Sequence, residues 1–156
     1  MEGHSQIDTV RTEFIDRMGV ISQNEGMPRM SGQIFAMLVF DGEAIAFGDL
    51  ATSLEVSRAT ISTSIRILED RGLIRRVNKR GERQDYFQLA DDAYITMMKF
   101  ALVGTQRAKG EIDDTIANLP TNAGDIRRRL SDYAGFYDAI SASLSSAMSE
   151  MPKTKP

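Results

Sequence analysis

Apolar residues in the first forty positions recur at helical spacing. Ile7, Val10, Phe14, Met18 and Ile21 follow one another by three or four residues, which predicts an amphipathic helix over residues 6–24. Gly26 and Pro28 interrupt this helix, because glycine and proline break helical runs. A second helix is expected over residues 31–40, followed by a turn at Asp41-Gly42 and a very short strand over residues 44–46.

Residues 48–72 have the pattern of a helix, a tight turn at Glu55 and Val56, and a second helix. Leu50, Ala51 and Leu54 form the inward face of the first helix. Ser57 is a favourable N-cap for the second helix, because its hydroxyl can accept a backbone N–H of the first turn, and Gly72 ends that helix. At about 100° per residue, Ile61, Ile65 and Leu68 fall on one stripe, which we expect to be buried.

The opposite face of this second helix carries small and polar side chains. Ala59, Ser62, Thr63 and Arg66 lie on it, with Arg58 and Thr60 beside them near the helix start. Such a face fits deeply into a DNA major groove, where hydroxyls and a guanidinium reach base edges. A solvated helix face is the ordinary alternative, and the basic loop that follows favours the groove.

Two strands are expected directly after the helix, over residues 73–78 and 84–89, around the loop Lys79-Arg-Gly-Glu-Arg83. Gly81 can adopt the positive φ of a tight hairpin. Lys79, Arg80 and Arg83 are then left to contact phosphates or a minor groove, whose negative potential attracts arginine. Protection of edge strands against aggregation is the alternative use of such cations.

The last third of the chain predicts long helices. Asp91 and Asp92 begin one whose apolar side carries Tyr94, Met97, Met98, Ala101 and Leu102. The final helix, over residues 123–148, has a heptad-like seam of Ile126, Leu130, Tyr133, Tyr137, Ile140, Leu144 and Ala147. The rest of the fold offers too little surface to cover both this helix and the first one, so burial against a second copy is favoured.

These elements divide the chain into regions. Residues 29–89 are expected to form a winged helix-turn-helix lobe, in a mainly α fold with a small β-hairpin wing. Residues 1–28 and 90–150 are expected to form a helical dimerisation layer through Ile7, Val10, Phe14, Ile126, Leu130, Tyr133, Tyr137, Ile140 and Leu144. Residues 151–156 are expected to be a disordered tail.

The charge distribution agrees with this division. The chain of 156 residues has a net charge of −3. Residues 57–83 nevertheless carry eight basic and three acidic side chains, a local charge of +5, whereas residues 1–56 carry three basic and nine acidic ones. Affinity for phosphates depends on the local patch rather than on the net charge. The basic segment is the same one that the helix and loop patterns single out.

Composition excludes several other functions. The absence of cysteine removes disulfides, thiolate zinc sites, thiol nucleophiles and thiol redox sensing, and it is typical of a reducing cytoplasm. The single histidine, His4, lies at a terminus. The chain offers no Gly-rich phosphate loop and no nucleophile elbow, so we expect no enzyme activity, no metal and no cofactor. No apolar stretch reaches the length of a membrane span.

These motifs resemble the MarR family of bacterial winged-helix regulators, and more narrowly its GbsR-like branch. The resemblance covers about residues 13–98. It is carried by Phe14–Gly19, Glu25–Arg29 with Gly32, Leu50-Ala51, Val56-Ser57, Ile61-Ser62, Leu68-Glu69, Gly72–Ile74 and the wing segment Gly81–Tyr86. It implies a homodimer in which two winged lobes read a pseudo-palindrome.

The leading hypothesis is therefore a sequence-specific regulator of double-stranded DNA, with repression the favoured mode. Its expected DNA contacts are Ser57, Arg58, Thr60, Ser62, Thr63, Arg66, Lys79, Arg80 and Arg83, and Arg75 and Arg76 are expected to neutralise phosphates. A winged-helix module for protein–protein interaction is the alternative. A small-molecule effector stays open: Phe14, Met18, Met37, Tyr94 and Met98 could line its site, although simple core packing is favoured.

Overall fold

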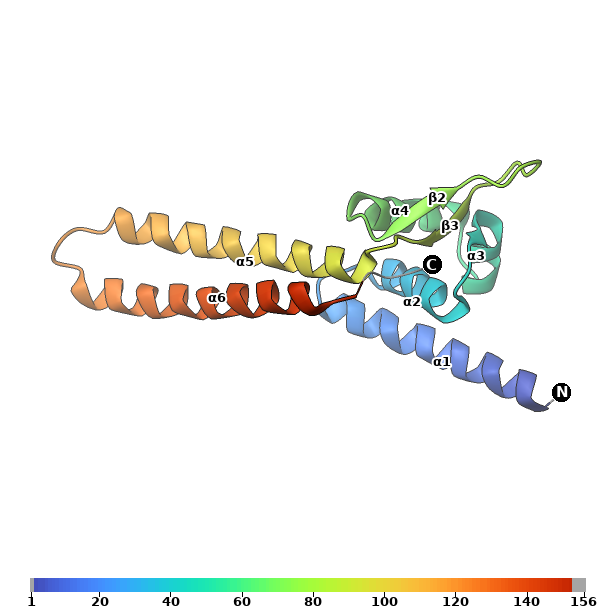
Figure 1. Cartoon of the computed structure of the whole chain (residues 1–156), viewed down its shortest axis with the longest axis horizontal. Helices are drawn as coiled ribbons and strands as arrows, with labels where there is room; N and C mark the ends of the chain where they lie inside the picture. Colours follow the sequence, from blue (N-terminus) through green and yellow to red (C-terminus); the bar gives the residue numbers. More distant parts are fainter. Residues whose placement is uncertain (1, 153–156) are drawn as a thin grey trace. The chain divides into compact units, whose positions relative to one another are not determined.

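The computed structural model describes residues 2–152, which form two compact units, residues 2–93 and residues 94–152 (Figure 1). The first unit contains α1 (Glu2–Asn24), α2 (Arg29–Asp41), β1 (Ile45–Ala46), α3 (Phe47–Leu54), α4 (Arg58–Asp70), β2 (Ile74–Val77) and β3 (Tyr86–Leu89), and the second contains α5 (Ala93–Ala117) and α6 (Gly124–Glu150). The expectation of a mainly α fold with a small wing is confirmed. Of the tail expected to be disordered, only Met151 and Pro152 lie within the described residues.

The sheet is antiparallel and has the strand order β1-β3-β2. β2 and β3 form the wing hairpin, in which Ile74 pairs with Leu89 and Val77 pairs with Tyr86. β1 adds two residues to the other edge of β3, through the pair Ile45 and Phe87 and its neighbour. The short strand expected over residues 44–46 is thus present, and it holds the start of α3 beside the root of the wing.

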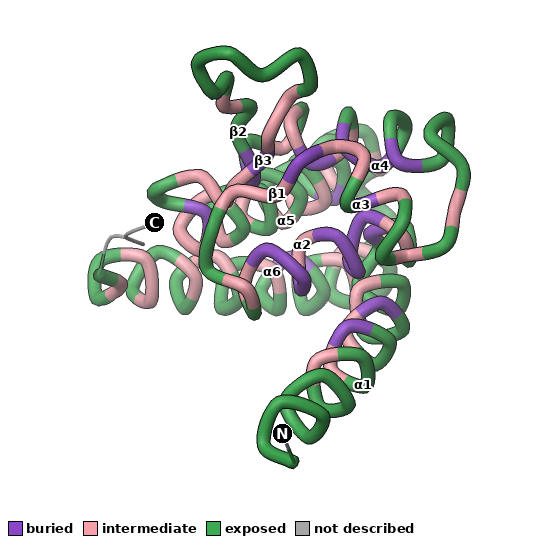
Figure 2. The backbone as a smooth tube through the Cα atoms, turned by 90° about the vertical axis from the view of Figure 1, so that its right-hand side faces the viewer, coloured by how far each residue is buried: buried purple, intermediate pink, exposed green. Residues whose placement is uncertain are grey.

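The core of the first unit lies between α2, α4 and the sheet. Ile61, Ile65 and Leu68 are buried, as their stripe on α4 predicts, and they pack in one cluster with Leu50 of α3 and Phe87 of β3. Figure 2 shows buried backbone concentrated in α2, α4 and the sheet, whereas the loop between β2 and β3 is exposed. Burial on one side of α4 therefore leaves its other side free for contacts.

The turn between α3 and α4 follows the predicted geometry. Glu55 adopts the left-handed conformation, with φ 55° and ψ 44°, and its N–H bonds back to the last turn of α3. Ser57 is the N-cap of α4, and its hydroxyl accepts the N–H of Thr60 at 3.1 Å. At the other end Gly72 has φ 70°, the left-handed conformation that stops the helix.

Helix α1 begins four residues before its predicted start. Its buried residues are Ile15 and Gly19, which pack against α2. Ile7 and Val10, predicted for a dimer contact, are 56% and 50% exposed, while Phe14 is half-buried with its ring 5.8 Å from that of Phe40. The helix thus has one face on the lobe and an apolar stripe that the described residues leave uncovered.

The second unit is a hairpin of two antiparallel helices, α5 and α6, lying side by side (Figure 1). Ile112 of α5 and Ala134 of α6 are its buried residues, and Lys109 forms ion pairs with Asp113 of its own helix and with Asp138 of α6. None of the helices in residues 2–152 combines the length and apolar character that a membrane crossing requires.

The predicted seam of α6 divides into two faces in this hairpin. Leu130, Tyr137 and Leu144 are half-buried on the side of Ala134. Ile126, Tyr133 and Ile140 are exposed, and so is Phe136, which the seam did not include. The single stripe read from the sequence therefore combines residues of an internal face with residues of an outer apolar face.

Candidate nucleic-acid interface

The outer face of α4 forms the first part of the site. Ser57, Arg58, Ala59, Thr60, Ser62, Thr63 and Arg66 are all exposed. The Thr63 hydroxyl donates to the carbonyl of Ala59, and the hydroxyls of Ser57 and Thr60 lie 2.9 Å apart. Each of these oxygens retains lone pairs toward solvent, so the face can both accept hydrogen bonds and, through Arg66, donate them.

The packing of α4 against α2 involves two serines that the sequence analysis missed. Ser31 of α2 is fully buried and donates its hydroxyl to the carbonyl of Ser64 at 3.1 Å, and the Ser64 hydroxyl donates to Thr60 at 2.8 Å. Ser64 lies next to the stripe of Ile61 and Leu68 on the helical wheel, which was the available signal. The bond from Ser31 joins α2 to α4 and helps to fix which face α4 exposes, whereas the bond from the Ser64 hydroxyl lies within α4.

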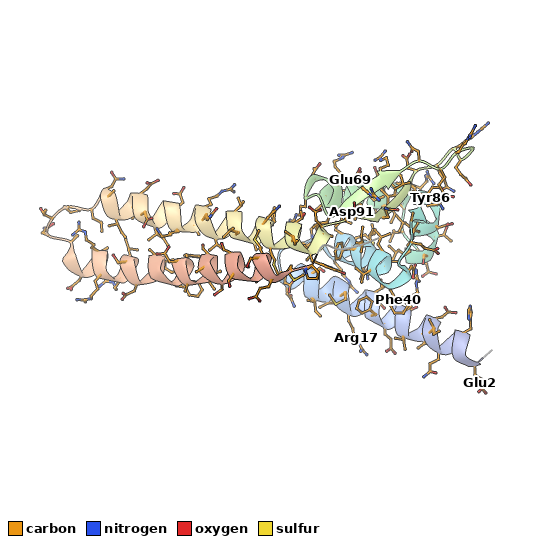
Figure 3. The ribbon with its side chains drawn as sticks, in the orientation of Figure 1. Glu2, Arg17, Phe40, Glu69, Tyr86 and Asp91 are labelled. Atoms are coloured by element: carbon orange, nitrogen blue, oxygen red, sulfur yellow. The ribbon has the colours of Figure 1, made fainter. Side chains whose placement is uncertain are left out.

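The wing supplies the second part of the site. Residues 78–84 are exposed throughout, and Gly81 at the tip has φ 83°, as the hairpin requires. Lys79, Arg80 and Arg83 all lie in this segment. The Lys79 ammonium sits 4.2 Å from the ring centre of Tyr86, a cation–π contact that orders its side chain while leaving its charge in place (Tyr86 is labelled in Figure 3).

Arg58 connects the two parts of the site. Its guanidinium lies 4.5 Å from the ring centre of Phe47 at the start of α3. A cleft of about 320 Å³ lies between α3, α4 and the root of the wing. It is lined by Phe47, Arg58, Ser62, Ile65, Arg76, Arg83, Gln84, Asp85 and Phe87. Expected contacts from the helix and from the wing therefore line one concave surface, which is suited to an anionic backbone.

Arg75 and Arg76 were expected to neutralise phosphates, and in the structure both lie beside carboxylates of the same unit. Arg75 lies 3.7 Å from Asp91, and Arg76 bonds to Glu69 at 3.1 Å and to Asp85 at 2.9 Å. The hydrogen bond to Glu69 is the main cause that raises the pKa of Arg76 above its ordinary value. Glu69 lies within the basic segment and was a candidate for such a pair, whereas Asp85 and Asp91 lie outside that segment.

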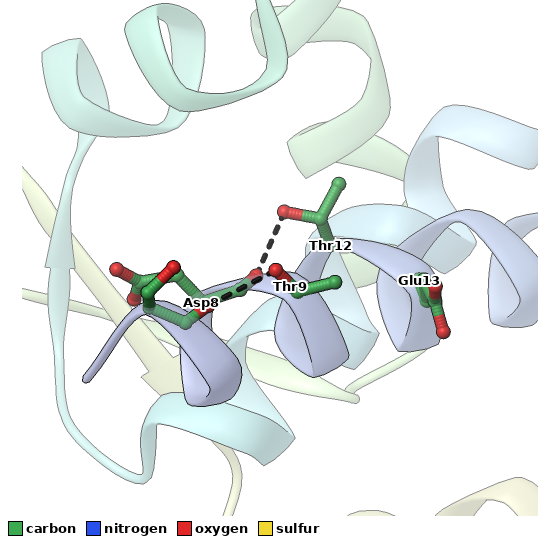
Figure 4. Close-up of a pocket in the computed structure, with 5 residues that line it drawn as sticks. Asp8, Thr9, Thr12 and Glu13 are labelled. Carbon is green, nitrogen blue, oxygen red and sulfur yellow. Dashed lines mark hydrogen bonds between the residues drawn. The ribbon is translucent and has the colours of Figure 1, made fainter. Parts of the chain in front are cut away.

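Two other regions show no comparable site. Phe14, Met18 and Met37, three residues named for an effector, pack in or against the hydrophobic core of the first unit. A hollow near the start of α1 is lined by Ser5, Asp8, Thr9, Thr12 and Glu13, all from that one helix (Figure 4). Its two threonine hydroxyls donate to carbonyls of α1 itself, so the hollow is a groove between neighbouring side chains.

The fold and the basic cleft together define a winged helix-turn-helix. Residues 25–84 match the model of the MarR family. The matched stretch runs from the end of α1 through α2, α3, α4 and β2 to the wing, so the winged lobe of this chain is similar to the MarR family.

Two bacterial regulators are similar to this chain. The HTH-type transcriptional regulator MmpR5 of Mycobacterium tuberculosis is 35% identical over 103 residues, 65% of this chain and 60% of that protein. The putative HTH-type transcriptional regulator YvaV of Bacillus subtilis is 22% identical over 92 residues, 59% of this chain and 52% of that protein. This chain thus spans less than two thirds of either relative.

A solved structure extends the likeness to nearly the whole fold. The crystal structure of a transcriptional regulator superposes with a TM-score of 0.73 and 25% sequence identity. The match covers 89% of this chain and 95% of the other. The likeness therefore includes the long helices as well as the winged lobe.

Proposed function

We propose that this protein is a transcriptional regulator that binds double-stranded DNA through α4 and the wing. The observation that carries the proposal is the shared cleft, in which Arg58 of α4 and Arg83 of the wing line one surface beside the exposed face of α4. The regulators among its relatives support the same function. A major groove is wide enough to admit a helix such as α4, and the wing would then reach the adjacent backbone or minor groove.

The contacts divide by chemistry. Thr60, Ser62, Thr63 and Arg66 would face base edges, because they combine exposure with hydroxyl or guanidinium groups. Arg58, Lys79 and Arg80 would contact phosphates, and Arg83 would contact the backbone or minor groove beside the wing. Ser57 would contribute mainly by capping α4, since its hydroxyl already accepts the N–H of Thr60.

The functional unit would be a homodimer. Helix α6 has an outer apolar face that consists of Ile126, Tyr133, Phe136 and Ile140. An apolar face of this size is unfavourable in water, and its exposed aromatic rings favour burial against another chain. Ile7 and Val10 of α1 are exposed apolar residues that would also be buried in the dimer. Residues 1–28 and 90–150 would thus form the dimerisation layer, with one winged lobe per half-site of a pseudo-palindrome.

The narrower relationship and the mode of action are part of the same proposal. Two segments favour the GbsR-like branch: Glu25–Arg29, which leads into α2, and Gly81–Tyr86 in the wing. Repression is the simplest consequence of a dimer that occupies a promoter.

Selection of bound fragments from randomised DNA tests the proposal most directly. We expect enrichment of a two-fold site with half-sites about one helical turn apart. Arg66→Ala should change the enriched sequence, whereas the control Arg129→Ala on α6 should not. No enrichment, together with no retardation of genomic fragments at low salt, would contradict the proposal and favour the protein-interaction module.

A further inference from the structure

The root of the wing carries a three-residue ion-pair network centred on Arg76 of β2. Its Nη2 donates to Oε1 of Glu69 on α4 at 3.1 Å, and its Nη1 donates to Oδ2 of Asp85 at 2.9 Å (Glu69 is labelled in Figure 3). Glu69 belongs to the last turn of α4, and Asp85 directly precedes β3. One guanidinium thus connects α4 with both arms of the wing hairpin.

Further contacts hold the same region. The guanidinium of Arg76 lies 5.3 Å from the ring centre of the buried Phe87. On the other side, the N–H of Phe47 donates to the carbonyl of Asp85 at 2.9 Å, and the N–H of Gly48 donates to Oε1 of Gln84 at 3.1 Å. The wing root is therefore attached to the start of α3 as well as to the end of α4.

The negative net charge of this network disfavours the binding of a phosphate. Arg76 and its two carboxylates sum to −1, and both carboxylates lie within hydrogen-bond distance of the one cation. A phosphate that displaced them would meet two uncompensated negative groups. Arg83, which shares the cleft with Arg76, lies in the exposed loop and is the better phosphate ligand.

We propose that Arg76 is a positioning residue, which sets the wing at a fixed place relative to α4 so that both can contact DNA at once. The proposal rests on the DNA-binding function proposed above. Groove contacts by the helix and backbone contacts by the wing are made simultaneously only if their separation matches the duplex. Fixing that separation in the free protein removes an ordering cost from binding.

The double substitution Glu69→Gln and Asp85→Asn separates positioning from simple charge. It removes two negative charges beside the cleft, so electrostatics alone would strengthen DNA binding. If Arg76 positions the wing, the double substitution should instead weaken DNA binding. We expect the affinity for DNA to fall by about three- to tenfold, the effect of losing an exposed but networked ion pair. Arg76→Gln should weaken binding similarly, and Arg75→Gln, an equal loss of charge on the same strand, should weaken it less.

Amide hydrogen exchange supplies a readout that needs no DNA. The amides of Phe47 and Gly48 report the seating of the wing root, because they bond to Asp85 and Gln84. In Arg76→Gln and in the double variant these amides should exchange faster than in the wild type, with exchange in the core of α2 unchanged. Arg75→Gln should leave both amides at the wild-type rate.

The two readouts make failure of each proposal distinguishable. Wild-type exchange at Phe47 and Gly48 in the double variant would overturn the positioning role, and so would DNA binding as tight as or tighter than the wild type. If the wild-type protein binds no DNA, the DNA-binding function fails, and faster exchange in the variants would still establish that Arg76 holds the wing.

Discussion

Gly32 of α2 and Gly19 of α1 lie at one helix crossing, and neighbouring side chains leave neither position room for a methyl group. A Cβ atom on Gly32 would lie 3.5 Å from the Cα of Gly19 and would overlap the side chain of Ser22. A Cβ atom on Gly19 would lie 2.6 Å from Cγ of the buried Gln33. This crossing holds α1 on the winged lobe, and the ion pair of Arg11 with Asp41, at 2.7 Å, extends the contact.

Gly32→Ala should therefore destabilise the first unit. Overpacking at a fixed helix crossing costs about 1–3 kcal/mol, because backbone must move to admit the extra carbon. Urea unfolding followed by circular dichroism measures this change. Gly135→Ala on α6 is the reference, since no heavy atom lies within 4 Å of its Cβ position, and there alanine should stabilise by roughly 0.5–1 kcal/mol. Equal unfolding free energies for Gly32→Ala and the wild type would contradict the close crossing.

A substitution at Glu55, in the turn of the helix-turn-helix, should stabilise the protein, in contrast to Gly32→Ala. Among the described residues it is the one non-glycine residue with positive φ, at 55°. A side chain in this region is strained, so Glu55→Gly should raise the free energy of unfolding by about 0.5–1 kcal/mol, after the added entropy of the unfolded chain is subtracted. Glu55→Ala keeps the Cβ atom and should give little change. If alanine stabilised as much as glycine, the effect would come from the lost carboxylate rather than from the backbone.

The local features of the lobe could be predicted from sequence because each depends on neighbouring residues. The N-cap at Ser57 and the stop at Gly72 are set by short-range hydrogen bonds and by φ. The buried stripe of Ile61 and Leu68 follows from helical periodicity. Most elements of the winged helix depend on local signals of this kind, and the structure has these helices and strands where the sequence predicts them.

Long-range pairings could not be predicted in the same way. The bond from Ser31 to Ser64 joins residues 33 apart, and no periodicity marks it. The pairing of Arg76 with Glu69 and Asp85 depends on how strands and helix meet. A charge count treats Arg76 and Arg83 alike, although only the structure shows that one of them is already paired.

The two faces of α6 lead to a prediction about assembly. Phe136 lies on the outer face with Tyr133 and is 55% exposed, so Phe136→Glu should place a charge in the proposed dimer contact. Light scattering after size exclusion should show the wild type at about twice the chain mass of 17.3 kDa and the variant shifted toward that mass. Ala142→Glu adds the same charge on the other side of the helix and should remain dimeric. A wild type that elutes as a monomer at micromolar concentration would contradict the proposal.

Arg83 and Arg66 should affect DNA binding in different ways, because one is expected at phosphates and the other at base edges. Arg83→Ala should weaken binding to all sequences and reduce the slope of log affinity against log salt by about one unit per lost phosphate contact. Arg66→Ala should leave that slope nearly unchanged and reduce discrimination between the operator and a mismatched site by about 1–3 kcal/mol. Fluorescence anisotropy titrations at several salt concentrations distinguish the two effects. Arg17→Ala is the control: it removes an exposed cation of α1 that pairs with Glu13, outside the cleft, and it should change neither quantity. An unchanged slope for Arg83→Ala would contradict a phosphate contact by Arg83.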